Sequence, residues 1–147
     1  MKEYCGVSGI IGNFDDIFYK VYLTLFALQH RGQESAGISL NDKDHFFTYK
    51  RSGFARNLLD VPNVQRKGKI GIGHVRYSTS GNSNIANAQP VYANTNHGKL
   101  SLAHNGNLVN YKKLRNHLRA SGAIFQGNSD SEMIMHYLAH QEGDFLA

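Results

Sequence analysis

Cysteine and proline are nearly absent from this chain of 147 residues, which holds one cysteine and two prolines. One cysteine excludes an internal disulfide framework, and it also excludes zinc and iron–sulfur sites that need several cysteine ligands. No apolar run comes near the ~18 residues that a transmembrane helix requires. The start of the chain, Met1–Tyr4, carries an acid and is followed by no apolar segment, so we expect no secretory signal. These absences favour a cytoplasmic protein of the reducing cytosol, without a membrane partner.

A strong charge of one sign is also lacking. The 16 basic and 11 acidic residues give a net charge of +5, an excess that favours anionic ligands. The basic residues fall in short groups at 50–51, 66–69 and 112–113 rather than in a long stripe with interleaved aromatic residues, so we expect no nucleic-acid partner. With 41% hydrophobic and 18% charged residues, the composition is that of a globular protein, and the length predicts one domain.

The spacing of apolar residues predicts an α+β fold. Runs of small and β-prone residues predict strands at 6–11, 36–40, 45–50, 70–76 and 100–104. Apolar residues three or four positions apart predict helices from about 15 to 30, from Asn110 to Gly122, and from Ser129–Asp130 onward. The first helix is expected to bury one face, made of Ile17, Val21, Leu25 and Leu28. The order of these elements favours an antiparallel sheet over a series of βαβ units.

The single cysteine, Cys5, has two interpretations. A lone free cysteine is commonly a small buried hydrophobe. If the chain were cut after Tyr4, however, Cys5 would own a free α-amino group with a pKa near ~8, close to the ~8.5 of its thiol. Nucleophile and base would then lie in one residue, without a histidine partner. The residues around Cys5 leave both interpretations open.

Three further segments place polar residues directly after a predicted strand or before a predicted helix. Arg76, at a strand end, can hold a carboxylate through two parallel hydrogen bonds, or it is an exposed surface arginine. Asn105 and Gly106 offer a side-chain amide and a main-chain N–H to a developing oxyanion, or they form a hairpin turn. Asp130 can receive a cationic amino group, or its segment only caps the last helix.

Other patterns are weak. His136 and His140 lie one helical turn apart, but no third ligand is evident, so we expect no metal site. Gly71 and Gly73 lack the third glycine of a dinucleotide-binding loop.

Taken together, five segments in chain order resemble the N-terminal glutaminase domain of the glutamine phosphoribosylpyrophosphate amidotransferases, a family also called amidophosphoribosyltransferases. These segments are Cys5–Ile10, Leu28–Gly37, Gly73–Thr79, Ala103–Leu108 and Ser129–Glu132. The resemblance runs from Cys5 to about His140. The sister family of glucosamine-6-phosphate synthases typically has different residues at three of these places, namely at His30–Glu34, at Arg76–Thr79 and at Ser129–Glu132.

The resemblance implies an N-terminal-nucleophile hydrolase with four layers, α/β/β/α, incomplete at its C-terminus. It implies that glutamine is hydrolysed to glutamate and ammonia through a γ-glutamyl thioester. The roles that it implies are nucleophile for Cys5, oxyanion donors for Asn105 and Gly106, α-carboxylate binding for Arg76 with Thr79 nearby, α-ammonium binding for Asp130, and orientation of the nucleophile for Arg31.

The same resemblance implies a division of the chain into a propeptide, residues 1–4, removed to expose Cys5, and a truncated glutaminase domain, residues 5–147. We expect the family's phosphoribosyltransferase domain to be absent; that domain would use phosphoribosyl pyrophosphate and Mg²⁺ to make phosphoribosylamine in the first step of purine synthesis. No cofactor is therefore expected in this chain, and an iron–sulfur cluster only in full-length relatives, which form homo-oligomers. Two alternatives stay open: an inactive glutamine-binding fragment, and the glutaminase domain of another class II amidotransferase such as glucosamine-6-phosphate synthase.

Overall fold

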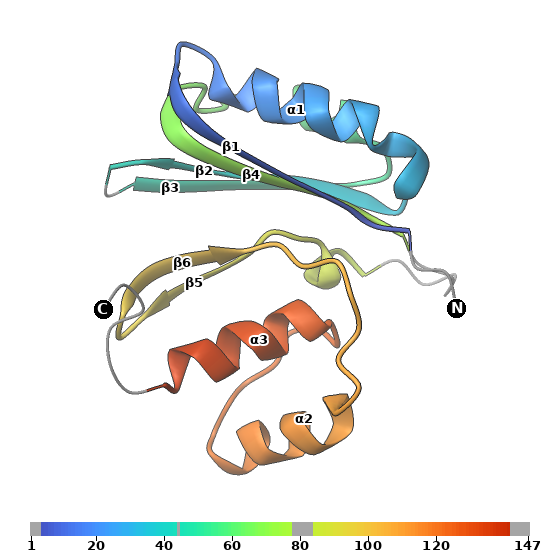
Figure 1. Cartoon of the computed structure of the whole chain (residues 1–147), viewed down its shortest axis with the longest axis vertical. Coiled ribbons are helices and arrows are strands. Elements are labelled where there is room, and N and C mark those ends of the chain that lie inside the picture. The colour runs from blue at the N-terminus through green and yellow to red at the C-terminus, as the bar shows by residue number, and fades with distance from the viewer. Residues whose placement is uncertain (1–3, 44, 78–83, 142–147) are drawn as a thin grey trace.

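Two antiparallel β-sheets lie face to face between layers of helices in the computed structural model, which describes residues 4–43, 45–77 and 84–141 (Figure 1). Helix α1 covers the outer face of the first sheet, and helices α3 and α2 lie beyond the second (Figure 1). This arrangement confirms the predicted α+β class with antiparallel sheets. No helix among the described residues is long and apolar enough to cross a membrane.

The first sheet has the strand order β1-β4-β2-β3. Its strands are β1 (Gly6–Phe14), β2 (Ser35–Asp42), β3 (His45–Ser52) and β4 (Gly68–Arg76). The strands predicted at 36–40 and 45–50 are confirmed and form an antiparallel hairpin, because β2 pairs with β3 in unbroken register from Ser35↔Ser52 to Asp42↔His45. Strand β1 pairs with β4 from Gly6↔Val75 onward, so the start of β1 lies beside the end of β4.

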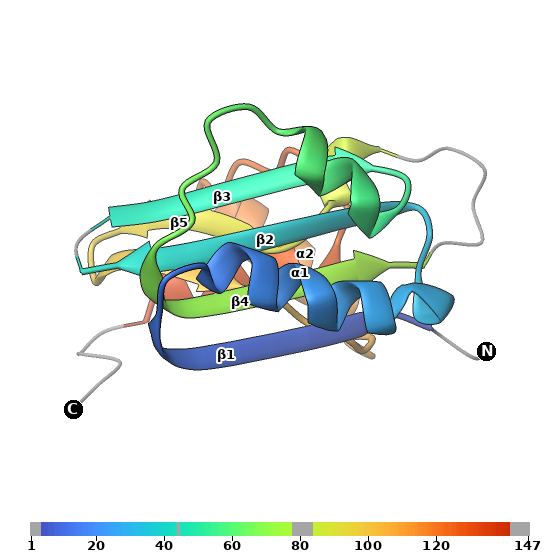
Figure 2. The same cartoon turned by 90° about the horizontal axis from the view of Figure 1, so that it is seen from above.

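Helix α1 (Ile17–Ala27) packs its apolar face on the first sheet, where it lies along β4 and β1 (Figure 2). The predicted face is confirmed for Ile17, Val21 and Leu25, which are each fully buried. Leu28, the fourth residue of that prediction, follows the end of the helix and is only partly buried. Asp16 caps the helix by accepting a hydrogen bond of 2.8 Å from the Tyr19 N–H. The helix ends at Ala27, earlier than predicted, and the chain continues as a 3-10 turn over Gln29–Arg31.

The second sheet consists of β5 (Val91–Thr95) and β6 (Gly98–Leu102). Strand β6 confirms the strand predicted at 100–104, although it begins and ends two residues earlier. Strand β5 is not predicted, because its short run contains Ala93 and Asn94, which are poor strand formers. It forms because it pairs with β6 along its whole length.

The last two helices, α2 (Tyr111–Ala120) and α3 (Asp130–Ala139), confirm the two predicted C-terminal helices. Asn110 holds the N-cap position of α2 but makes no side-chain cap hydrogen bond. Gly122 follows the end of α2 with φ +94, a conformation that glycine adopts readily. Ser129 caps α3, since its Oγ accepts a hydrogen bond of 3.3 Å from the Glu132 N–H. Two further 3-10 turns are not predicted: Ala55–Asp60 lies between β3 and β4 of the first sheet, and Ile85–Asn87 lies between the first sheet and the second.

Candidate active site

Cys5 lies at the start of β1, beside the residues that end β4. The Tyr77 N–H donates a hydrogen bond to the Cys5 Sγ at 3.4 Å. Cys5 is half-buried rather than fully buried. The interpretation of Cys5 as a fully buried core residue is therefore wrong. Its sulfur atom meets both polar atoms of the Tyr77 main chain, since the thiol also donates to the Tyr77 oxygen at 4.0 Å.

Two side chains from distant segments hold the main-chain oxygen of Cys5. The Arg31 Nε donates to it at 2.7 Å, and the Asn105 Nδ2 donates to it at 3.1 Å. Arg31 reaches Cys5 because the neighbouring Gly32 packs against the backbone of β4, where a Cβ atom would lie 2.6 Å from the carbonyl carbon of Arg76. The fold thus brings three predicted site residues, Cys5, Arg31 and Asn105, into direct contact.

Asn105 and Gly106 lie in the connection between β6 and α2, where no second strand follows. The alternative of a hairpin turn at these two residues is therefore wrong. Gly106 is exposed. A Cβ atom there would lie 2.8 Å from the His104 Nε2, so the His104 ring would have to move to admit a larger residue. Gly106 and the Asn105 side chain are available to a molecule bound beside Cys5.

Arg76 is paired with an acid rather than exposed. Its Nη1 atom donates to the Glu34 Oε1, and the Glu34 N–H donates to the Arg76 main-chain oxygen at 3.0 Å. The Arg76 side chain is 20% exposed and that of Glu34 only 9%. The alternative of a free surface arginine is wrong. A guanidinium group has five N–H donors, so the pair with Glu34 leaves several that can bind a carboxylate.

Asp130 is the first residue of α3, and its Oδ2 accepts a hydrogen bond of 2.5 Å from the Leu108 N–H. The carboxylate therefore ties the start of α3 to the loop that contains Asn105. Capping of α3 in this segment is confirmed, but Ser129 performs it and not Asp130. Thr79, the remaining predicted site residue, lies outside the described residues.

Three further residues make contacts at the site that the sequence does not predict: Glu34 with Arg76, His74 with His104, and Tyr77 with Cys5. Glu34 and His74 belong to the segments that carry the family resemblance, yet no role follows from their residue types alone. His74 is fully buried in β4, and its Nε2 lies 3.1 Å from the His104 main-chain oxygen. Burial lowers the pKa of His74 to about 4, with the nearby charge of Arg76 acting in the same direction and the His104 hydrogen bond opposing both. The sequence feature that could have pointed to His74 is its place as a polar residue at a buried position of a predicted strand, where it needs a hydrogen-bond partner.

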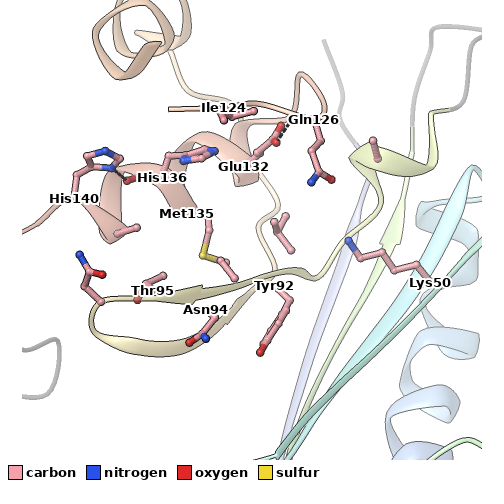
Figure 3. A pocket seen from close by; sticks show the side chains of 15 residues that line it. Lys50, Tyr92, Asn94, Thr95, Ile124, Gln126, Glu132, Met135, His136 and His140 are labelled. Atoms are coloured by element: carbon pink, nitrogen blue, oxygen red, sulfur yellow. Dashed lines mark hydrogen bonds between the residues drawn. The ribbon is translucent and has the colours of Figure 1, made fainter. Parts of the chain in front are cut away.

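A separate cavity of about 820 Å³ opens between β3, β5 and α3 (Figure 3). Lys50, Tyr92, Glu132 and His136 are among its lining residues, and none of the described predicted site residues is. Burial lowers the pKa of Lys50, and the negative charge of Glu132 partly opposes that shift.

His136 and His140 are joined by a hydrogen bond of 2.7 Å from the His140 Nδ1 to the His136 main-chain oxygen. Within residues 4–43, 45–77 and 84–141, no group of three or more His, Cys, Asp or Glu side chains is arranged to hold a metal ion.

Comparison with known proteins identifies the domain. Residues 59–146 match the glutamine amidotransferase domain family, and this range includes Arg76, Asn105 and Asp130. The chain is 39% identical over 144 residues to the amidophosphoribosyltransferase of Methanothermobacter thermautotrophicus, covering 96% of this chain and 30% of that protein. It is 46% identical over 140 residues to amidophosphoribosyltransferase 2, chloroplastic, of Arabidopsis thaliana, covering 94% of this chain and 25% of that protein.

A solved structure of similar fold is glutamine phosphoribosylpyrophosphate amidotransferase from B. subtilis, complexed with ADP and GMP. It matches with a TM-score of 0.84 and 39% identity, covering 95% of this chain and 30% of that one. The chain therefore spans less than a third of the length of these relatives. The match over more than half of its residues shows that this chain belongs to the glutamine amidotransferase domain family, and the relatives that it resembles are amidophosphoribosyltransferases.

Proposed function

We propose that this chain is a glutaminase domain of the N-terminal-nucleophile hydrolase type, with Cys5 as its nucleophile once residues 1–4 have been removed. One observation carries the proposal: Arg31, Tyr77 and Asn105, from three separate segments, all donate hydrogen bonds to Cys5. A cysteine held in this way is positioned as a reactive group rather than as a packing residue.

The available groups complement the three polar parts of glutamine. The unused donors of Arg76 would bind the α-carboxylate, with Thr79 as a second ligand. The Asp130 carboxylate would receive the α-ammonium group. Asn105 and Gly106 would donate to the side-chain carbonyl oxygen as its negative charge develops.

The proposed reaction uses the free α-amino group of Cys5 as the base. The amine takes the thiol proton, and the thiolate attacks the Cδ atom of glutamine to form a tetrahedral oxyanion. As that oxyanion collapses, the C–N bond breaks and the leaving nitrogen takes the proton back from the amine, which releases ammonia. Water then attacks the γ-glutamyl thioester, the amine accepts its proton, and glutamate leaves as the thiol is restored.

In the structure, Tyr4 is still joined to Cys5, so the Cys5 nitrogen is an amide and has no lone pair that can act as a base. Removal of residues 1–4 is therefore a required part of the proposal. Within a longer protein, the ammonia would react with phosphoribosyl pyrophosphate at another domain. The amidophosphoribosyltransferase relatives support this use over that of a glucosamine-6-phosphate synthase.

The first experiment is to measure the intact mass of the purified chain and to sequence its N-terminus. A chain that begins at Cys5 should release ammonia from glutamine, and Cys5→Ala should reduce the release to the uncatalysed background. A variant that lacks residues 2–4 separates maturation from chemistry, because removal of its initiator methionine exposes Cys5 directly. If this variant begins at Cys5, is folded and hydrolyses no glutamine, the proposal is wrong.

A second candidate function, glutamine binding without hydrolysis, is favoured by the amide-bonded nitrogen of Cys5. It predicts saturable glutamine binding by calorimetry, lost in Arg76→Ala and in Asp130→Ala, with no ammonia released by a chain whose intact mass includes residues 1–4. Ammonia release from that uncut chain, or the absence of glutamine binding, would reject this second candidate.

A further inference from the structure

The main chain of His104, the residue before Asn105, is held at both its N–H and its carbonyl oxygen by buried side chains. The His74 Nε2 lies 3.1 Å from the His104 main-chain oxygen, and the Gln89 Oε1 accepts a hydrogen bond of 2.7 Å from the His104 N–H. Because a carbonyl oxygen only accepts, the His74 Nε2 must carry the proton. His74 is 0% exposed and Gln89 is 6% exposed, so water does not compete for either bond.

The His74 hydrogen bond joins the two halves of the candidate active site. His74 belongs to β4 in the first sheet and lies opposite Val7 of β1, two residues from Cys5. His104 follows β6 of the second sheet and directly precedes Asn105. The distance between the nucleophile and the oxyanion donors therefore depends on this connection between the sheets.

Gln89 is fixed to the first sheet as well. A Cβ atom at Gly37 of β2 would lie only 2.1 Å from the Gln89 main-chain oxygen, so the two backbones are in direct contact. Both side chains that hold the main chain of His104 are thus anchored on the same sheet as Cys5.

We propose that His74 and Gln89 are positioning residues for the Asn105–Gly106 oxyanion donors, acting through the main-chain N–H and C=O of His104. This inference rests on the proposed glutaminase function. It predicts an effect on kcat and not on the affinity for glutamine, because neither side chain is among the groups assigned to the substrate carboxylate or ammonium. The Nδ1 of His74 has no hydrogen-bond partner among the described residues. Replacing the ring therefore removes a single hydrogen bond, the one from Nε2 to the His104 oxygen.

The test compares His74→Leu with His74→Gln in the mature chain that begins at Cys5. Leucine removes the donor, whereas the glutamine Nε2 restores a donor near the position of the histidine Nε2. We expect His74→Leu to lower kcat about ten- to a hundredfold with KM for glutamine changed by less than about threefold, because small displacements of catalytic groups cost rate rather than binding. His74→Gln should recover most of the loss. His45→Leu, the same change at an exposed position of β3, is the matched control and should leave both constants at the parent values.

Gln89 supplies a second test if His74→Leu does not fold. Gln89→Leu should lower kcat in the same way, and Gln89→Glu, which keeps an acceptor at this position, should restore it. Parent kcat in both leucine variants would overturn the proposal. So would a loss that appears equally in KM and that neither conservative variant restores.

A measurement without turnover separates this inference from the proposed function. In Cys5→Ala chains, amide hydrogen exchange at His104 should accelerate in Gln89→Leu, which removes the acceptor of this N–H, and in His74→Leu, which frees the carbonyl of the same residue, while the amides of β4 keep their protection. If the parent chain hydrolyses no glutamine but this acceleration is seen, the proposed function fails and the connection through His104 stands. Unchanged exchange at His104 in both His74→Leu and Gln89→Leu would reject the connection itself.

Discussion

The Asn105 Nδ2 donates a hydrogen bond to the main-chain oxygen of Cys5 at 3.1 Å, which places a side-chain amide directly beside the proposed nucleophile. In Asn105→Ala this donor is lost, and we expect kcat for glutamine hydrolysis to fall on the order of 10²–10³-fold, as when an oxyanion donor is removed elsewhere. Asn107→Ala, an exposed change in the same loop, is the control and should keep the parent kcat. A parent-like kcat in Asn105→Ala, measured by steady-state ammonia release, would contradict the role of this amide.

Arg76 should set the affinity for glutamine through the planar geometry of its guanidinium group. Arg76→Lys keeps the positive charge but loses the parallel pair of donors, so we expect KM for glutamine to rise about ten- to a hundredfold, the range for a hydrogen bond to a charged group. Arg51→Lys, an exposed change on β3, is the control. Steady-state kinetics check the result, and an unchanged KM in Arg76→Lys would remove Arg76 from the substrate site.

Leu25 should contribute strongly to stability because it is fully buried between α1 and the first sheet. The space above Gly73 is filled by this side chain, whose Cδ atoms lie 2.9 and 3.0 Å from where a Gly73 Cβ would be. We expect Leu25→Ala to lower the free energy of unfolding by about 2–5 kcal/mol. Leu23→Ala, at a position 46% exposed on the same helix, should change it by less than about 1 kcal/mol. Urea denaturation measures both, and equal losses in the two variants would contradict this packing.

Stability should fall as the pH is lowered through the range in which His74 titrates. The folded chain holds the pKa of His74 at about 4, whereas the unfolded chain has the ordinary value of 6.5. Between these values the unfolded state binds a proton that the folded state does not, so the free energy of unfolding decreases as the pH falls. The full shift corresponds to about 3 kcal/mol, most of which is lost by pH 4.

The matched protein for the pH measurement is His74→Gln, which has no titrating ring at this position. Its free energy of unfolding should fall less than that of the parent between pH 7 and pH 4.5, while all other titrating groups act equally in both. Parallel pH profiles from denaturation would show that the folded and unfolded states bind the His74 proton equally.

The sequence predicts most of the fold because apolar periodicity reports burial directly. Ile17, Val21 and Leu25 recur at helical spacing, and all three lie in the core. Strand β5 is not predicted because it is stabilised by pairing with β6, and the residue types of Val91–Thr95 do not indicate this pairing. The early end of α1 at Ala27 has a similar cause, since Gln29 hydrogen-bonds to the Gly32 carbonyl and to the Ala55 N–H in place of continuing the helix.

The sequence predicts which residues belong to the candidate site, but it does not predict which of their atoms are in contact. Cys5, Arg31 and Asn105 are expected at the site, but which atoms meet depends on how β1, the turn after α1 and the loop after β6 converge. The ion pair between Arg76 and Glu34 cannot be predicted either, because the two residues lie 42 positions apart in the chain and only the fold brings them together. The contact of His74 is not predicted because its side chain donates a hydrogen bond to a main-chain oxygen. Every residue has such an oxygen, so the residue type of the partner carries no signal.

The distance along the chain between Cys5 and its hydrogen-bond partners also determines when each of them is made during translation. Arg31 and Tyr77 are translated first, and Asn105 comes last, 100 residues after the cysteine. At typical translation rates, about 5 to 20 s pass between the synthesis of Cys5 and that of Asn105, the last of the three residues that donate hydrogen bonds to it. Under the proposed function, a nascent chain that ends before Asn105 lacks one of the two oxyanion donors, so glutamine hydrolysis would begin only after the loop that follows β6 has been made.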